Sequence, residues 1–149
     1  MSTQITTQGG YLISKIHQLS GRIFTKLLKE ADIDDLNPAQ GRILFALWKQ
    51  NNVPISTLAQ ETQLHKSTLT KMLDRLEDSG HLVRKPSQND RRIVTISLTE
   101  KNYLLREKYE AVSRSMREIF YNDMLQEEVM ELDRLLNIIL GNLVEHEEM

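Results

Sequence analysis

Residues 66–98 have the sequence KSTLTKMLDRLEDSGHLVRKPSQNDRRIVTISL, in which the spacing of the apolar residues changes partway along. Over residues 66–79 the apolar residues recur every three or four positions, which predicts an amphipathic helix. Gly80 follows at the position where a glycine commonly ends a helix in the left-handed conformation. Residues 81–86 and 92–98 are short runs of apolar and β-branched residues, separated by a polar loop. The sequence therefore predicts a helix followed directly by a β-hairpin.

The residues before this stretch predict two further helices and a very short strand. Asn37 is a favourable N-cap and Pro38 suits the first position of a helix, so a helix should begin there. Ser56 should cap a second, shorter helix, and residues 63–65 should form the turn that leads into the helix at Lys66. The expected elements are a helix over 38–49, an edge strand within 53–55 and a short helix over 57–62.

Longer helices should flank this unit on both sides. Apolar residues spaced by three and four predict a helix over 10–31. Thr99 should cap a helix that continues to Phe120, and a break near 122–123 should separate it from a last helix over 125–143. The expected organisation is one domain over 1–149, with a winged part at 36–98 and a helical dimerisation part formed by 10–31 and 99–145.

Two helices joined by a three-residue turn, then a glycine and a β-hairpin, describe a winged helix-turn-helix. The expected fold class is therefore mainly α with a small β-hairpin wing, with N- and C-terminal dimerisation helices. The second helix of such a pair fits the major groove of duplex DNA, which is about 12 Å wide. Hydroxyl and cationic side chains on that helix can contact base edges and phosphates. The predicted contacts on the helix are Lys66, Ser67, Thr68, Thr70, Lys71 and Arg75.

The hairpin should contact DNA as well. Arg91 and Arg92 lie at its tip and Arg84 on its approach, and a narrow, negative minor groove attracts arginine. Residues 65–92 contain seven basic side chains against four acidic ones, whereas residues 118–149 contain one basic side chain and nine acidic ones. The charge is thus polarised along the chain, although the net charge is −2. This distribution favours a nucleic-acid partner for the middle of the chain.

These charged residues also allow an ordinary structural interpretation. The cations between Lys66 and Arg75 are compatible with a plain solvated helix face. Lys71 is three residues from Asp74, and Arg75 is three residues from Asp78, so both cations are within reach of a helical ion pair. Individual DNA contacts are therefore less firmly indicated than the DNA-binding helix as a whole.

The composition excludes several other classes of protein. The chain has no cysteine, which excludes a disulfide framework, a thiolate zinc site and a thiol redox switch. The four histidines, His17, His65, His81 and His146, lack the spacing of a helical metal pair, so no metal or cofactor is expected, although His146 lies between two glutamates. No phosphate-binding glycine loop or nucleophile elbow is present, so we do not expect an enzyme. Without a signal peptide or a long apolar run, the expected location is cytoplasmic, with no membrane partner.

Several segments together resemble the multiple antibiotic resistance regulator (MarR) family. They are Leu58-Ala59, KSTLT at 66–70, LDRLEDSG at 73–80, NDRR at 89–92 and ISLTEK at 96–101. The wing signature of that family is an Asp, an Arg two positions on and a closing Leu-Thr pair, which here are Asp90, Arg92, Leu98 and Thr99. The resemblance extends over about residues 10–145.

The resemblance implies a homodimer that binds a pseudo-palindromic double-stranded DNA operator, most often as a repressor. It implies that Asp90 orients Arg92, which reaches a minor groove or its phosphates. It also implies that a small aromatic or phenolic acid releases the protein from DNA. Members of the family that sense organic hydroperoxides use a reactive cysteine, which this chain lacks, and the ligand set of zinc-sensing members is matched poorly.

The apolar stripes of the first and last helices predict a homodimer independently. The stripe from Leu125 to Leu143 is roughly 27 Å long at about 1.5 Å per residue. The small winged part can hardly cover both stripes, so burial against a second copy is the simplest solution. Two recognition helices would then lie about one DNA turn, roughly 34 Å, apart. The predicted interface residues are Leu12, Ile16, Leu19, Leu125, Val129, Leu132, Leu136, Ile139 and Leu143.

A ligand pocket is predicted where the first and second helices approach the long helix after the wing. Its candidate residues are Tyr11, His17, Arg22 and Trp48. Arg22 offers a cationic partner for an anionic effector, with an ordinary surface arginine as the alternative. Core or interface packing is the favoured alternative for Trp48. A winged-helix adaptor that binds another protein and no DNA is the alternative function for the whole chain.

Overall fold

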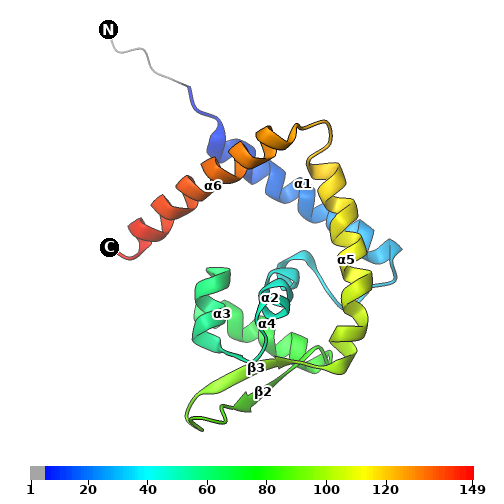
Figure 1. Cartoon of the computed structure of the whole chain (residues 1–149), viewed down its shortest axis with the longest axis vertical. Helices are drawn as coiled ribbons and strands as arrows, with labels where there is room; N and C mark the ends of the chain where they lie inside the picture. Colours follow the sequence, from blue (N-terminus) through cyan, green and yellow to red (C-terminus); the bar gives the residue numbers. More distant parts are fainter. Residues whose placement is uncertain (1–5) are drawn as a thin grey trace. The chain divides into compact units, whose positions relative to one another are not determined.

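The computed structural model describes residues 6–149, and in this part the chain is mainly helical with one small sheet. Its elements are α1 (Gly9–Glu30), α2 (Pro38–Lys49), β1 (Val53–Pro54), α3 (Ile55–Thr62), α4 (Lys66–Asp78), β2 (Leu82–Pro86), β3 (Val94–Leu98), α5 (Glu100–Phe120) and α6 (Gln126–Glu147) (Figure 1). The chain divides into two compact units, residues 1–116 and 117–149, and α5 runs from the first into the second. The predicted sequence of helices with one β-hairpin is confirmed.

The sheet is antiparallel, with the strand order β1-β3-β2. Leu82 of β2 lies opposite Leu98 of β3, and Val53 of β1 lies opposite Ile96. β1 is thus the edge strand that the sequence predicted, a place where Pro54 is tolerated. α3 and α4 lie against the sheet, and the closed end of the β2–β3 hairpin extends past them (Figure 1). This hairpin is the wing.

Most helix boundaries follow from the capping residues that the sequence shows. The Asn37 side chain accepts from the Gln40 N–H and the Gln40 side chain accepts from the Asn37 N–H, both at 2.9 Å, which is a capping box. Gly80 has φ +82° and ends α4, as predicted. The start of α3 was predicted wrongly, because the helix begins at Ile55 and Ser56 does not cap it. Pro54 supplies the extended residue before the helix, with φ −64° and ψ 155°.

The core of the first unit lies between α2, α3, α4 and the sheet. Leu69, Leu73 and Leu76, one face of α4, are all 0% exposed. Full burial of each leucine side chain stabilises the fold by about 1.5–3 kcal/mol, so this face of α4 is held firmly against the core. α5 packs on the unit through Tyr109, whose hydroxyl occupies the space that a Cβ on Gly41 would need. Only glycine at that position lets α2 approach α5 so closely.

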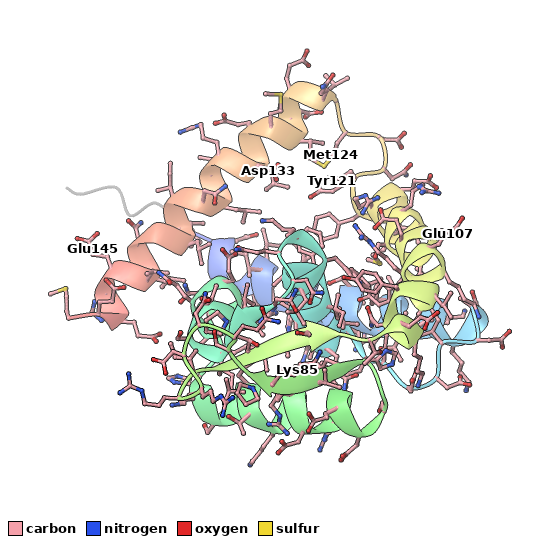
Figure 2. The ribbon with its side chains drawn as sticks, turned by 60° about the horizontal axis from the view of Figure 1, so that its bottom comes forward. Lys85, Glu107, Tyr121, Met124, Asp133 and Glu145 are labelled. Atoms are coloured by element: carbon pink, nitrogen blue, oxygen red, sulfur yellow. The ribbon has the colours of Figure 1, made fainter. Side chains whose placement is uncertain are left out.

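The second unit consists of the end of α5, a turn and α6. Tyr121 and Met124 lie in this turn, and the Met124 N–H donates to the Tyr121 carbonyl at 3.1 Å (Figure 2). α6 itself has no buried residue. Among the described helices, none combines the length and the apolar character that crossing a membrane requires.

Candidate nucleic-acid interface

α4 presents the polar face that the sequence predicted. The turn before it is tight, because Gln63 adopts a left-handed conformation at φ 58° and the Thr62 hydroxyl donates to the Leu58 carbonyl. The buried leucines on the other side of α4 leave the polar face turned outward. Lys66, Ser67, Thr68, Lys71 and Arg75 are exposed, and Thr70 is half-buried with its hydroxyl donating to the Lys66 carbonyl at 2.8 Å.

The wing tip holds one arginine in a defined orientation. Arg92 Nε lies 3.1 Å from Asp90 Oδ1, and Arg92 Nη2 lies 3.2 Å from Asp90 Oδ2. The Arg92 N–H donates to the same carboxylate, and these hydrogen bonds hold the pKa of Asp90 below its usual value. The Arg92 side chain nevertheless remains 90% exposed. The contact that the resemblance implied is therefore present, and it leaves the guanidinium accessible.

Arg84 differs from the other predicted DNA-binding residues. Its guanidinium lies 2.5 Å from Asp74 Oδ1 and 2.9 Å from Glu77 Oε1, and its side chain is only 25% exposed. The Arg84 N–H also donates to Glu77 at 3.0 Å. Hydrogen bonds to Glu77 and Asp74 raise the pKa of Arg84. The hydrogen bonds that Glu77 accepts from the Arg84 side chain and backbone N–H lower the pKa of Glu77. Arg84 thus ties β2 to α4 and fixes the wing on the recognition helix.

The Arg84–Asp74 ion pair also bears on the two ion pairs within α4 that the sequence allowed. Within residues 6–149, the ion pairs include neither Lys71 with Asp74 nor Arg75 with Asp78. Asp74 is instead bound by Arg84, which lies ten residues further along the chain. Arg75 lines an open groove that also contains Asp34, Asp35 and Asp78.

The wing carries further exposed residues. Arg91 is exposed at the tip, and Lys85 lies on β2 with its side chain in solvent (Figure 2). Ile93 and Val94 are also exposed, at 43% and 41%. The Ile93 N–H donates to the Asp90 carbonyl at 3.0 Å, so Ile93 belongs to the loop and β3 begins only at Val94. The sequence reasoning placed these two apolar residues in a strand and did not mark them as surface.

The predicted dimer residues lie on two exposed apolar faces. On α1, Leu12, Ile16 and Leu19 are 45%, 45% and 48% exposed. On α6 and just before it, Leu125 and Leu143 are more than 60% exposed, and Val129 and Leu132 are half-buried. Other large apolar side chains of α6 missing from the predicted stripe are exposed as well: Met130, Leu135, Ile138 and Leu140. The apolar surface of α6 is therefore wider than a single heptad stripe.

An open hollow of about 730 Å³ lies between α1 and α2. His17 and Arg22, two of the predicted ligand residues, line it, and Arg42 of α2 adds a cation that the sequence reasoning missed. Trp48 does not line it, because its indole N–H donates to Asn102 at 2.8 Å and its ring packs against Tyr109. For Trp48 the core-packing alternative therefore holds.

Tyr11, the remaining predicted ligand residue, lies away from this hollow, and no metal site was expected. Tyr11 is 66% exposed and does not line the hollow. Residues 6–149 contain no group of three or more His, Cys, Asp or Glu side chains close enough together to hold a metal ion, and this includes the surroundings of His146.

Comparison with known proteins places these features in a family. The MarR family model matches residues 36–94, which include α2 to the start of β3. The organic hydroperoxide resistance transcriptional regulator of Bacillus subtilis (strain 168) is 40% identical over 91 residues, an alignment that covers 60% of this chain and 61% of that regulator. This chain thus spans less than two thirds of that relative. The transcriptional repressor IacR of Pseudomonas putida is 25% identical over 133 residues, which cover 89% of this chain and 78% of the repressor.

Solved structures agree with the sequence comparisons. A mutant MarR from E. coli, crystallised with operator DNA, has a TM-score of 0.77 and 26% identity to this chain. The superposition covers 88% of this chain and 92% of that one. The family match includes the helix-turn-helix and the wing up to Val94, the segment on which the DNA-binding residues were predicted. Residues 36–94 of this chain therefore match the MarR family, and the chain has the winged helix-turn-helix fold of a MarR protein that binds operator DNA.

Proposed function

We propose that this protein binds a pseudo-palindromic double-stranded operator as a homodimer and represses transcription. The observation that carries the proposal is the joint geometry of α4 and the wing. α4 turns a face of cations and hydroxyls outward, and Arg84 ties the wing to the same helix through Asp74 and Glu77. One protomer therefore offers a major-groove helix and a minor-groove arginine in a fixed relation.

The proposed contacts divide by their chemistry. Lys66, Lys71, Arg75 and Arg91 are exposed cations that neutralise phosphates, a term that contributes most of the affinity for any duplex. Arg92 is aimed by Asp90 and enters the minor groove. The remaining proposed contacts on α4 are Ser67, Thr68 and Thr70, whose hydroxyls reach phosphates or base edges. Arg84 acts by supporting the wing.

The homodimer is proposed from the apolar faces of α1 and α6. Exposed apolar patches of this extent commonly mark interfaces in soluble proteins. The proposed interface consists of Leu12, Ile16, Leu19, Leu125, Val129, Leu132, Leu136, Ile139 and Leu143, together with the additional exposed side chains of α6. A two-fold symmetric dimer contains two copies of α4, one for each half-site of an operator. The repressor assignment is supported by IacR, a relative named as a repressor.

We also propose that a small aromatic acid controls this binding from the hollow between α1 and α2. His17, Arg22 and Arg42 line that hollow, and they suit a carboxylate on an aromatic ring. Thermal unfolding with a panel of aromatic acids tests this, because a ligand that binds only the folded dimer raises its melting temperature. An Arg22→Ala, Arg42→Ala double variant should lose the shift, and a panel without any shift contradicts the ligand site.

A titration with salt tests DNA binding itself against the adaptor alternative. The purified protein is mixed with a labelled random-sequence duplex of about 30 base pairs, and its affinity is measured as the salt concentration rises. A DNA-binding dimer should bind at low salt, with a slope of about −0.9 per phosphate contacted in the plot of log affinity against log salt concentration. An adaptor should bind no duplex under any of these conditions, and that result would refute the proposal.

A further inference from the structure

Four polar side chains form a hydrogen-bonded chain at the joint between α4 and the wing, which is the turn at residues 79–81. None of the four is a proposed contact to DNA or to the ligand, and the two central ones are buried. Asn102 of α5 and His81, which precedes β2, are both 0% exposed. Trp48 Nε1 of α2 lies 2.8 Å from Asn102 Oδ1, and Asn102 Nδ2 lies 3.1 Å from His81 Nδ1. His81 Nε2 lies 2.8 Å from Asp35 Oδ2, in the loop between α1 and α2. Four separate segments are thus linked side chain to side chain.

The chemistry of these groups fixes the direction of every hydrogen bond. An indole N–H only donates, so the Asn102 carbonyl oxygen must accept from Trp48. The Asn102 amide group then donates to His81 Nδ1, which therefore carries a lone pair, and the ring proton lies on Nε2. That proton is donated to Asp35, which Lys101 also contacts at 3.1 Å. If the Asn102 amide were rotated by 180°, its NH₂ group would face the indole N–H of Trp48, and two donors would then lie opposite each other.

The backbone of His81 is held at the same point. Its N–H donates to the Leu76 carbonyl of α4 at 2.9 Å, and its carbonyl accepts from the N–H of Thr99, just before α5, at 3.1 Å. Gly80, immediately before it, has φ +82° and makes the sharp change of direction from α4 to the wing. His81 is therefore the residue at which α4, β2 and α5 meet.

We propose that Asn102 and His81 are positioning residues for DNA binding, which hold the joint so that α4 and the wing meet one duplex together. The inference rests on the proposed function. A pair of apolar side chains of the same shape would leave the core about as stable, since a hydrogen bond contributes little beyond what water offers the unfolded chain. Hydrogen bonds are directional where apolar contacts are not, so this chain determines the position of the joint more than its stability.

The first test replaces Asn102 by leucine, which neither accepts from Trp48 nor donates to His81. The probe is a duplex that the parent protein selects from a random-sequence pool. If α4 and the wing of this variant are in the DNA-binding arrangement about one tenth of the time, the affinity for this duplex falls about tenfold. Ile43→Val is the matched control, because Ile43 is 0% exposed on the same helix as Trp48 but lies outside the polar chain. It should lower the melting temperature without weakening the binding of the duplex.

The second test replaces Asn102 by aspartate, which has the same shape and still accepts from Trp48. This side chain restores the bond to His81 only when one extra proton is present, on the carboxyl or on Nδ1. The charged groups at or beside the chain are Asp35, Lys101 and Arg106, whose guanidinium lies 5.9 Å from the centre of the Trp48 ring. Asp34, Arg75 and Asp78 line the groove next to Asp35. These groups are the same in the parent, which is measured at each pH as the reference. Relative to the parent, Asn102→Asp should bind well at low pH and lose affinity as the pH rises.

The outcomes separate this inference from the proposed function. A parent that selects no duplex overturns both. A parent that selects a duplex, with Asn102→Leu binding as tightly or Ile43→Val losing as much affinity, overturns the positioning role alone. If Asn102→Leu does not fold, the pH profile of Asn102→Asp decides, and a constant ratio to the parent at all pH values contradicts the inference.

Discussion

Replacing Arg92 by alanine should weaken operator binding while leaving the dimer intact. The Arg92 side chain is 90% exposed, and its hydrogen bonds within the described residues go to Asp90 alone, so no core contact is lost. An arginine that enters a groove contributes about 1–3 kcal/mol to binding, which corresponds to roughly a 5- to 150-fold loss of affinity. The slope of log affinity against log salt concentration should also become shallower by about one for each wing.

Fluorescence anisotropy with a labelled duplex at fixed salt measures this loss. Arg92→Lys should fall between the parent and Arg92→Ala, because lysine keeps the charge but cannot make the two-pronged contact with Asp90. Arg114→Ala is the matched control, since Arg114 is an exposed arginine of α5 outside the proposed interface. Equal affinity of Arg92→Ala and the parent at the same salt concentration would remove the wing from the mechanism.

Three further changes probe other parts of the molecule. Arg84→Met should lower the free energy of unfolding by less than about 1 kcal/mol, because its partners are partly exposed, yet weaken DNA binding severalfold; unchanged binding in the anisotropy assay would contradict the wing-support role. Leu136→Asp places an unpaired charge in the proposed apolar interface and should yield a monomer in sedimentation velocity, whereas a persisting dimer would place the interface elsewhere. Partial burial works to raise the pKa of Asp35, but hydrogen bonds from His81 and Lys101 outweigh it and hold that pKa below 3.8. The stability that Asp35 contributes is therefore full above about pH 4 and lost as the pH falls through its lower folded value. Asp35→Asn should reduce the acid sensitivity measured by urea unfolding, and an unchanged pH profile would exclude this role.

The sequence predicted those features of the fold that depend on local chemistry. Asn37 caps α2 and Gly80 ends α4 because each acts on a backbone only a few residues away. The start of α3 was missed because Ser56 is a good cap in isolation, whereas Pro54 already provides the extended residue before the helix. Capping preference alone did not account for the proline two residues earlier.

The partners of charged and polar side chains were harder to predict. Arg84 appears in the sequence as one more cation of a basic segment, and only the pairing of β2 beside α4 brings it to Asp74 and Glu77. Nothing in the hydrophobic pattern marks Asn102 or His81 as buried, because both are polar and their partners are 21 or more residues away. Such contacts depend on tertiary structure, which periodicity and capping do not encode.

The candidate ligand hollow shows the same division. His17 and Arg22 were predicted at the approach of the first and second helices, and both line the hollow. Trp48 was a candidate at the same place, but its indole N–H donates to the buried Asn102. Arg42 was missed, although it lies one helical turn after Pro38 and therefore on the same face of α2.

Hydroxyl-radical footprinting of the selected duplex tests the central proposal most directly. Two copies of α4 and two wings should protect two backbone patches about one helical turn, roughly 34 Å, apart, with protection extending across the adjoining minor grooves. In Arg92→Ala the minor-groove protection should disappear while the two main patches remain. A single protected patch, or an even protection without helical periodicity, would contradict a dimer that presents two recognition helices and two wings to one duplex.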